Sequence, residues 1–325
     1  MRKTEIEISV VIFSYNKTEY IERAVRSVMF QDFNKSKYEV LIIKNFPNKE
    51  EWNSEVPKVR QFCKDGTIGD FIETAIKQSE GGIICFLDDD DWFAPDELNE
   101  ISRYFTEYEI GYLHDTPLIV APGKKIVRSA LQSDIYVSAA SLNRKKHHRL
   151  LSIYADGMMS SISIRREILQ DINEKPVTGP DYFIFYLSIA RGYGILASSK
   201  KLTYYLYHET SNKFPVDIKE QIRWRKNMVT YTTSNYANLL KYSENPLLRR
   251  QIQWNFLAFS INLKLILPDY KILEKDMLRL ILYSNTLKQV VRSLFLTSGV
   301  IMQKVFPTSF HKLFNHDILN RIGFI

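Results

Sequence analysis

The chain has 325 residues, of which 45% are hydrophobic and 25% charged, as in a folded soluble protein. This length allows one large α/β domain and a second, smaller unit. Two cysteines, Cys63 and Cys85, cannot form a disulfide framework or a zinc site by themselves, and we expect both to be buried and reduced. The net charge is +7, but residues 216–325 carry 16 Lys and Arg against 7 Asp and Glu. The whole basic excess therefore lies in the C-terminal third.

The start of the chain carries charged residues and runs directly into an apolar segment, which is unlike a signal peptide. No apolar stretch reaches the roughly 18–20 uncharged residues that a membrane-spanning helix needs. We therefore expect a cytoplasmic protein, and peripheral attachment at the inner face of the membrane stays an open alternative.

Short apolar strands alternate with helical patterns in the first 90 residues. Strands are predicted at residues 7–13, 38–43, 59–63 and 82–87, and helices at 19–30 and 70–78. Because helical crossovers of this length join parallel strands, the pattern predicts a parallel sheet with helices on both faces.

The pattern after Trp92 is mixed. Further helices are predicted at residues 96–105, from Arg165 onwards and at 180–190; further strands at 110–113, 117–120, 193–197 and 202–207; and a basic loop at 144–149. From residue 217 the sequence is helical almost to its end.

The strand predicted at 82–87 stops abruptly at four consecutive acids, residues 88–91. In open α/β sheets, ligands bind at the carboxyl ends of the strands, which is where these acids lie. Four crowded carboxylates repel one another unless they are solvated or neutralised by a cation, and oxygen ligands suit Mg²⁺ or Mn²⁺. The alternative is a solvated acidic turn that leads into the helix beginning near Asp96.

Two helical segments of the C-terminal third have distinct patterns. Residues 252–267 are apolar nearly all round and are predicted to be buried between neighbouring helices. Residues 287–305 are amphipathic, with an apolar stripe formed by Leu287, Val290, Val291, Leu294, Phe295, Ile301, Met302 and Val305. The stripe fits core packing, homodimerisation or docking on an anionic membrane surface. Nucleic-acid binding is not favoured, because this third has no recognised motif and no basic run.

Two motifs, in this order and at this separation, resemble glycosyltransferase family 2, the inverting sugar transferases of GT-A fold. They are Ser9-Val10-Val11-Ile12-Phe13-Ser14-Tyr15-Asn16-Lys17, with its following helix containing Tyr20–Val28 and Gln31, and Phe86-Leu87-Asp88-Asp89-Asp90-Asp91-Trp92. The resemblance covers about residues 7–210. It implies an α/β GT-A domain with a mixed, mainly parallel sheet over residues 1–215, and residues 216–325 are then a helical C-terminal region.

The resemblance also implies roles for individual residues. The acidic motif would hold Mn²⁺ or Mg²⁺ against the diphosphate of a nucleotide-sugar donor, with Asp90 as the metal ligand and Asp88 nearer the ribose. Asp89 and Asp91 are expected to be more dispensable. Donor contacts are expected from Ser14, Tyr15, Asn16, Asn45, Asp88, Asp89 and Arg166, and His208 is expected to complete the metal shell.

The family's catalytic base lies at the start of a helix after the metal motif, usually as the second member of Glu-Asp. The matching position here is Asp181 in Gly179-Pro180-Asp181, where Pro180 replaces the usual Glu. A carboxylate at a helix start is also a common N-cap, which is the alternative role for Asp181. The implied reaction transfers a sugar to a hydroxyl of a glycan or of a lipid-linked acceptor.

The sequence departs from the family where the nucleotide base is bound. Lys44-Asn45 replaces the usual Asp, although Asn45 can still pair with a pyrimidine imide. These departures leave open a non-catalytic sugar- or membrane-binding protein that retains the GT-A fold. A sugar-phosphate nucleotidyltransferase is disfavoured, because residues 14–17 contain no glycine for a phosphate loop.

Overall fold

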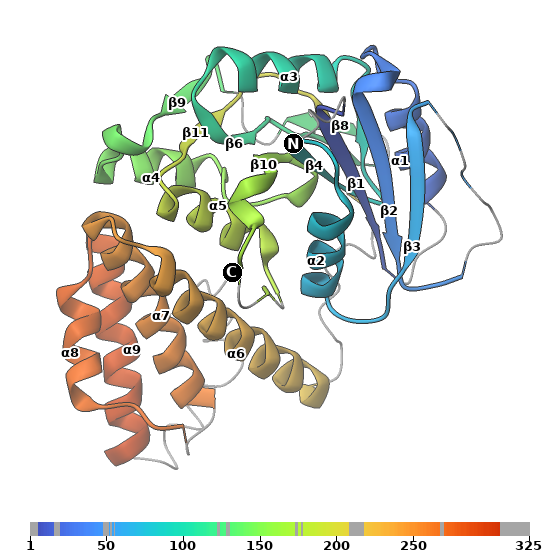
Figure 1. Cartoon of the computed structure of the whole chain (residues 1–325). Helices are drawn as coiled ribbons and strands as arrows, with labels where there is room; N and C mark the ends of the chain where they lie inside the picture. Colours follow the sequence, from blue (N-terminus) through green and yellow to red (C-terminus); the bar gives the residue numbers. More distant parts are fainter. Residues whose placement is uncertain are drawn as a thin grey trace. The chain divides into compact units, whose positions relative to one another are not determined.

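The computed structural model describes residues 6–15, 20–47, 52, 54, 56–121, 124–127, 131–172, 175–176, 178–207, 218–266 and 270–305. The chain divides into two compact units, Met1–Lys213 and Phe214–Ile325 (Figure 1). In the described part of the chain, no helix is both long and apolar enough to cross a membrane.

The first unit is built on an eight-stranded sheet in the order β3-β2-β1-β4-β10-β6-β11-β9. Its strands are β1 (Ile8–Ser14), β2 (Tyr38–Lys44), β3 (Lys58–Cys63), β4 (Ile83–Asp88), β6 (Ile110–His114), β9 (Ile135–Val137), β10 (Ile162–Arg165) and β11 (Gly194–Ala197). The four strands from β3 to β4 are all parallel, whereas β10 runs antiparallel to both β4 and β6. The sheet is therefore mixed, with a parallel half that carries the acidic motif.

Helices cover both faces of this sheet. They are α1 (Ile21–Met29), α2 (Ile68–Gln78), α3 (Glu97–Glu107) and α5 (Pro180–Ala190). Helices α1 and α3 share one core cluster with Val10 and Ile12 of β1. Phe71 of α2 instead packs on Phe13, with ring centroids 6.0 Å apart. Since neighbouring strand residues point to opposite faces, α2 lies on the other face from α1.

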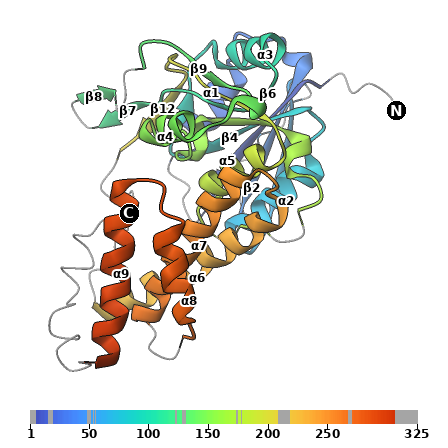
Figure 2. The same cartoon turned by 90° about the vertical axis from the view of Figure 1, so that its left-hand side faces the viewer.

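A second sheet, in the order β5-β12-β7-β8, lies beside the acidic motif. It consists of β5 (Trp92–Phe93), β12 (Thr203–Leu206), β7 (Leu118–Ala121) and β8 (Lys124–Val127), and Figure 2 shows β7, β8 and β12 together at one side. Because β5 follows the four acids directly, its pairing with β12 brings residues 204–206 to them.

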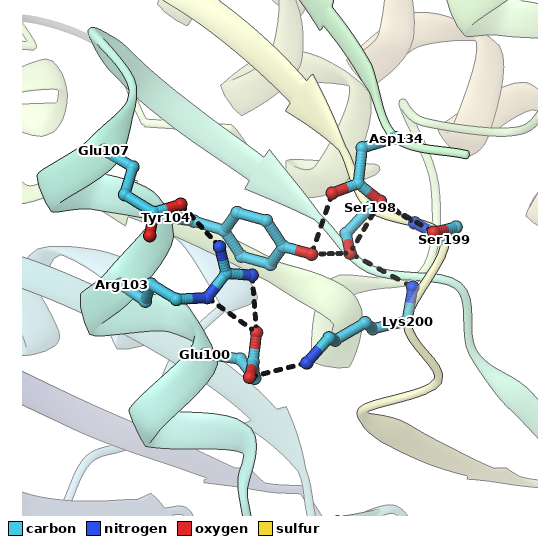
Figure 3. Close-up of polar contacts among 8 residues, drawn as sticks. All are labelled: Glu100, Arg103, Tyr104, Glu107, Asp134, Ser198, Ser199 and Lys200. Atoms are coloured by element: carbon cyan, nitrogen blue, oxygen red, sulfur yellow. Dashed lines mark hydrogen bonds and ion pairs between the residues drawn. The ribbon is translucent and has the colours of Figure 1, made fainter.

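Polar contacts fasten α3 to the segments before β9 and after β11 (Figure 3). The Tyr104 hydroxyl donates to Asp134 Oδ2 at 2.9 Å and lies 2.7 Å from Ser198 Oγ. Lys200 Nζ contacts Glu100 Oε1 at 2.6 Å. These contacts fix the turn that leads from β11 into β12.

The second unit consists of four described helices, α6 (Ile218–Tyr242), α7 (Pro246–Ile266), α8 (Glu274–Leu282) and α9 (Leu287–Val305). Its core contains Trp254, Ile261, Leu280 and Leu296, so the predicted burial within residues 252–267 is confirmed over much of α7. Most of the apolar stripe predicted on α9 is not buried in this core. Its exposed members are Leu287, Val291, Leu294, Ile301 and Val305. Helix α9 instead packs through Ser293, Leu296 and Gly299.

Two local predictions were wrong. The basic run at 144–149 is not a loop but lies in helix α4 (Arg144–Ser152), because Asn143 caps the first turn and His147 and Leu150 are buried. Cys63 is exposed, although Cys85 is buried as expected. A run of basic residues can therefore form a helix when one of its side chains and the residue that follows the run reach the core.

Candidate active site

The acidic motif forms a tight turn at the carboxyl end of β4. The Asp91 N–H donates to Asp88 O at 3.2 Å, and the Asp89 N–H donates to Phe13 O at the end of β1. Helix α1 also contacts the turn, since Arg23 Nη2 donates to Asp90 O at 2.7 Å. Main-chain bonds therefore fix how each of the four carboxylates projects.

Asp89 and Asp91 point into the protein, with exposures of 6% and 1%. Asp89 Oδ2 accepts a hydrogen bond from Ser14 Oγ at 2.5 Å. Asp91 accepts bonds from Ser160 Oγ at 2.6 Å and from the Leu206 N–H at 2.9 Å. These bonds hold the turn to β1, to the segment just before β10 and to β12, so we now predict that both acids support the turn, in contrast to the expectation that they are more dispensable. The bond between Ser14 and Asp89 also makes both residues supports of the turn, and their contacts to the donor stay predictions.

Asp88 and Asp90 are partly exposed, unlike Asp89 and Asp91. Burial raises the pKa of Asp88 well above its usual value, and the charges of Asp91, Asp90 and Asp89 raise it further. A bound cation would relieve this repulsion. Two carboxylates fit the way proteins hold Mg²⁺ or Mn²⁺, with other oxygens supplied by phosphate and water. Among the described residues, no group of three His, Cys, Asp or Glu side chains is arranged around a metal position.

Trp92 contacts two side chains. Its ring stacks on Tyr204 at 5.2 Å with an angle of 1° between planes, and the Arg23 guanidinium lies 3.9 Å from its centre. The indole therefore packs against both side chains and helps to hold the turn.

Asp181 is the second residue of α5. Gly179 occupies the N-cap position with φ +56°, a left-handed conformation that favours glycine, and Pro180 is the first helical residue. Asp181 is thus not the N-cap, although its Oδ1 accepts the Tyr182 N–H at 3.0 Å. Burial raises the pKa of Asp181, and its charge contributes to the raised pKa of Asp88. The candidate base and the acidic motif therefore lie near one another.

A strained loop lies beside Asp181. Tyr154 and Met158 have positive φ, at 59° and 63°, which non-glycine residues seldom adopt. A Cβ built on Gly157 would lie 3.9 Å from Asp181 Oδ2. The buried His114 ring contacts Gly157 O at 2.8 Å through Nε2 and so anchors the loop. Burial lowers the pKa of His114 to about 4, so the ring is neutral at physiological pH.

Sequence reasoning missed several of these residues. His114 and Ser160 support the site, and Asp156 precedes Gly157 in the same loop. Burial, together with the charge of Asp181, raises the pKa of Asp156 to about 6. His114 could have been identified as a candidate from the sequence, because it ends a strand of the sheet, as Asp88 does. Ser160 could not have been identified, because its partners lie 69 and 72 positions away along the chain.

The remaining predicted site residues fall into three groups. Tyr15 and Asn45 follow β1 and β2 at the same sheet edge as Asp88, and Tyr15 is 53% exposed. Asn16 and His208 lie outside the described residues. Arg166 is at the opposite edge, where its N–H donates to Gly82 O and its Nη1 to Ser79 O. Because β10 runs antiparallel to β4, Arg166 follows β10 at the amino end of β4 and is not brought to the acidic turn.

The sequence model of glycosyl transferase family 2 matches residues 9–172, just over half of the chain. The chain belongs to glycosyl transferase family 2. In this family member, the matched region contains β1, the acidic turn, the strained loop and β10, whereas Asp181 and the second unit lie beyond it.

Two curated relatives match shorter segments. Poly(ribitol-phosphate) beta-N-acetylglucosaminyltransferase TarS of Staphylococcus aureus is 27% identical over 111 residues, which are 32% of this chain and 19% of TarS. Glycosyltransferase AglE of Haloferax volcanii is 35% identical over 95 residues, which are 26% of this chain and 30% of AglE. The matches thus span less than a third of either relative.

Solved structures match nearly the whole chain. The crystal structure of S. aureus TarS 1–349 with UDP-GlcNAc has a TM-score of 0.61 at 18% identity and covers 98% of this chain and 90% of that one. The mannosyltransferase PcManGT of Pyrobaculum calidifontis with GDP-Man and Mn²⁺ has a TM-score of 0.51 at 13% identity, with coverages of 97% and 85%. These likenesses establish a GT-A glycosyltransferase fold, which confirms the predicted fold class.

Proposed function

We propose that the protein is a metal-dependent, inverting glycosyltransferase that moves a sugar from a nucleotide-diphosphate sugar to a hydroxyl of a glycan or lipid-linked acceptor. One observation carries the proposal. In a member of glycosyl transferase family 2, two partly exposed acids, Asp88 and Asp90, lie at the ligand-binding edge of the sheet with Asp181 nearby.

Asp181 is the proposed base. The acceptor oxygen forms a bond to the anomeric carbon as the bond from that carbon to the diphosphate oxygen breaks, and the hydroxyl proton passes to the Asp181 carboxylate. A raised pKa makes this carboxylate a stronger base than an exposed Asp. A divalent cation bound by Asp88 and Asp90, with His208 as a further proposed ligand, would neutralise charge on the departing diphosphate.

The proposed donor is a uridine diphosphate sugar. This proposal draws on TarS, whose structures with UDP-GlcNAc and with UDP share the fold of this chain. Asn45 replaces the family's usual Asp but offers both a donor and an acceptor to a uracil ring. The PcManGT structure contains GDP-Man, so a guanine donor is the competitor to exclude.

Thermal shift with UDP, GDP, dTDP and CDP, each with Mn²⁺, tests the donor. Preferential stabilisation by UDP supports the assignment, and preference for GDP contradicts it. Slow hydrolysis of UDP-sugars then tests catalysis. Asp90→Ala and Asp181→Asn should each abolish turnover, while Asp181→Asn should still bind UDP. Donor binding without turnover on any sugar would instead support a non-catalytic protein that retains the fold.

The exposed stripe on α9 supports a proposed docking role for the C-terminal unit. Leu287, Val291, Leu294 and Ile301 form an uncovered apolar row in a region with excess basic charge. Such a surface fits an anionic membrane or a second copy of the chain. Co-sedimentation with liposomes that depends on anionic lipid would support membrane docking, and a dimer mass in light scattering would support association of two copies.

A further inference from the structure

The outward face of helix α4 carries a dense positive charge. Its exposed basic side chains are those of Arg144, Lys145, His148 and Arg149. The opposite face is buried, and His147 on it packs on Tyr186 of α5 with ring centroids 5.8 Å apart. Among the described residues, no acidic side chain forms an ion pair with the four exposed groups, and the first turn of α4 contains no acid. The charge of this face is therefore not neutralised within the described part of the chain.

This arrangement of charge works against the stability of α4. Lys145 and Arg149 are four positions apart, so they lie on the same face of the helix and repel each other. Arg144 and Lys145 also lie in the first turn, where the positive end of the helix dipole favours acids. The buried face of α4 has to offset both effects. Charges that are unfavourable for folding are expected where they serve to bind an anion.

Helix α4 ends close to the proposed base. The Ala155 N–H donates to Leu150 O at 3.1 Å, so the chain turns back at the last turn of α4. Two residues later, a Cβ built on Gly157 would lie 3.9 Å from Asp181 Oδ2. These contacts place the last turn of α4 within roughly 15 Å of the Asp181 carboxylate. Figure 1 and Figure 2 both show α4 beside α5, so an acceptor held at Asp181 can extend over the positive face.

Tyr154 lies in the chain between α4 and Gly157. Its side chain is 52% exposed, and its φ of 59° is a backbone conformation that costs free energy in a tyrosine. Strained residues of this kind are concentrated at ligand-binding sites. An exposed aromatic ring offers a flat apolar surface on which one face of a sugar ring can pack. Tyr154 thus gives this region a preference for sugars that a purely electrostatic surface would lack.

The charge and the aromatic ring together define the class of ligand. Arg144 and Arg149 can each bind a phosphate through two hydrogen bonds, and the run between them spans about 8 Å along the helix axis. Several basic groups over this length exceed the single charge of one phosphodiester, so the face suits a chain with repeated anionic groups. A neutral glycan would leave the cations unused. An anionic membrane would use the cations but not a ring beside the proposed base.

We propose that the outward face of α4 binds the acceptor, and that this acceptor is a glycan with phosphate groups in its chain. The inference rests on the proposed function, since it names the substrate class that the glycosyltransferase would modify. Phosphates of the acceptor pair with Arg144, Lys145 and Arg149. One sugar ring packs on Tyr154, and a neighbouring hydroxyl reaches Asp181.

Fluorescence anisotropy on the full chain tests this surface. The labelled probes are a synthetic mannose tetramer joined by phosphodiester groups, the uncharged mannotetraose and linear inorganic polyphosphate. Lys145→Gln/Arg149→Gln removes two charges from α4, and Tyr154→Asn removes the ring but keeps a residue that tolerates a left-handed backbone. The matched control is Lys35→Gln/Lys201→Gln, because both lysines are exposed and neither forms an ion pair among the described residues.

We expect the phosphodiester tetramer to bind the wild type and the lysine control at least tenfold more tightly than mannotetraose does. In Lys145→Gln/Arg149→Gln its affinity should fall at least tenfold, and the slope of log affinity against log salt concentration should become shallower by about 1–2. Tyr154→Asn should weaken binding of the tetramer at least threefold and leave binding of polyphosphate unchanged. The α4 variant should keep or raise the melting temperature, since it removes a like-charge pair, so lost binding would not reflect unfolding.

Equal affinity for the tetramer in the α4 variant and in the lysine control, or no preference for the tetramer over mannotetraose, overturns the inference. Polyphosphate that binds as tightly as the tetramer, with no effect of Tyr154→Asn on either, shows an unspecific anion surface and contradicts an acceptor site. Co-sedimentation with phosphatidylglycerol vesicles that depends on α4, without binding of the tetramer, contradicts it in favour of a membrane. Hydrolysis of UDP-sugars by the wild type tests the proposed function separately, because hydrolysis without tetramer binding rejects only the phosphate-bearing acceptor.

Discussion

Asp115 should make the first unit less stable as the pH rises. The side chain is 3% exposed, and Thr203 Oγ1 donates to its Oδ2 at 2.8 Å. Burial raises the pKa of Asp115 to about 7 from 3.8. Between roughly pH 4 and 7 the folded state therefore binds more protons than the unfolded state, so stability falls as the pH rises through this window. A shift of about 3 units corresponds to at most about 4 kcal/mol.

Asp115→Asn removes this titration, since the amide stays neutral at every pH. Urea unfolding at pH 5, 6, 7 and 8 should show the free energy of unfolding of the variant rising relative to that of the wild type with each step, by about 2–3 kcal/mol in total over this range. Asp134→Asn is the control, because hydrogen bonds from Ser199 and Tyr104 hold the pKa of Asp134 below its usual value despite partial burial. The difference in the free energy of unfolding between Asp134→Asn and the wild type should stay constant over this pH range. The reasoning would be refuted if the free energies of unfolding of Asp115→Asn and of the wild type changed with pH in parallel.

Three further predictions concern a support of the site, a buried ion pair of the first unit and the proposed base. Ser160→Ala removes a donor to the buried Asp91 and should cost about 2–4 kcal/mol in urea unfolding, and a loss below 1 kcal/mol would contradict the supporting role. Arg60→Ala leaves the fully buried Glu39 without its 2.6 Å ion pair and should cost about 3–5 kcal/mol, whereas an unchanged unfolding midpoint would argue against this. Since the proposed base acts as a carboxylate, kcat should fall as the pH drops through the raised pKa of Asp181, and an acidic limb that persists in Asp181→Asn would assign it to another group.

The spacing of apolar residues predicted the strands and helices in the parallel half of the first unit well. Ile21, Ala24, Val25 and Val28 of α1 are buried as their spacing predicts, and the strand before the four acids ends at Asp88. These features depend on periodicity within a few residues. The helical pattern that begins near residue 217 also predicted the helices of the C-terminal third, where α6 to α9 lie.

Pairing between distant segments could not be predicted in the same way. Arg166 was expected to contact the donor, but the antiparallel direction of β10 puts it at the other end of β4. Asp89 and Asp91 look identical to Asp88 and Asp90 in the sequence. Only their partners, Ser14 and Ser160, distinguish them, and both contacts join residues about 70 positions apart.

The four acids of the turn differ in burial, and this difference has a consequence for mutagenesis. Alanine scanning through the four positions would yield two kinds of inactive variant that an activity assay alone cannot tell apart. Variants of Asp88 and Asp90 should keep the wild-type melting temperature and lose donor or metal affinity. Variants of Asp89 and Asp91 should lose activity because the fold around the turn is weakened, since their carboxylates anchor it to neighbouring strands. Inactive variants become assignable to ligand binding once each one's melting temperature is known.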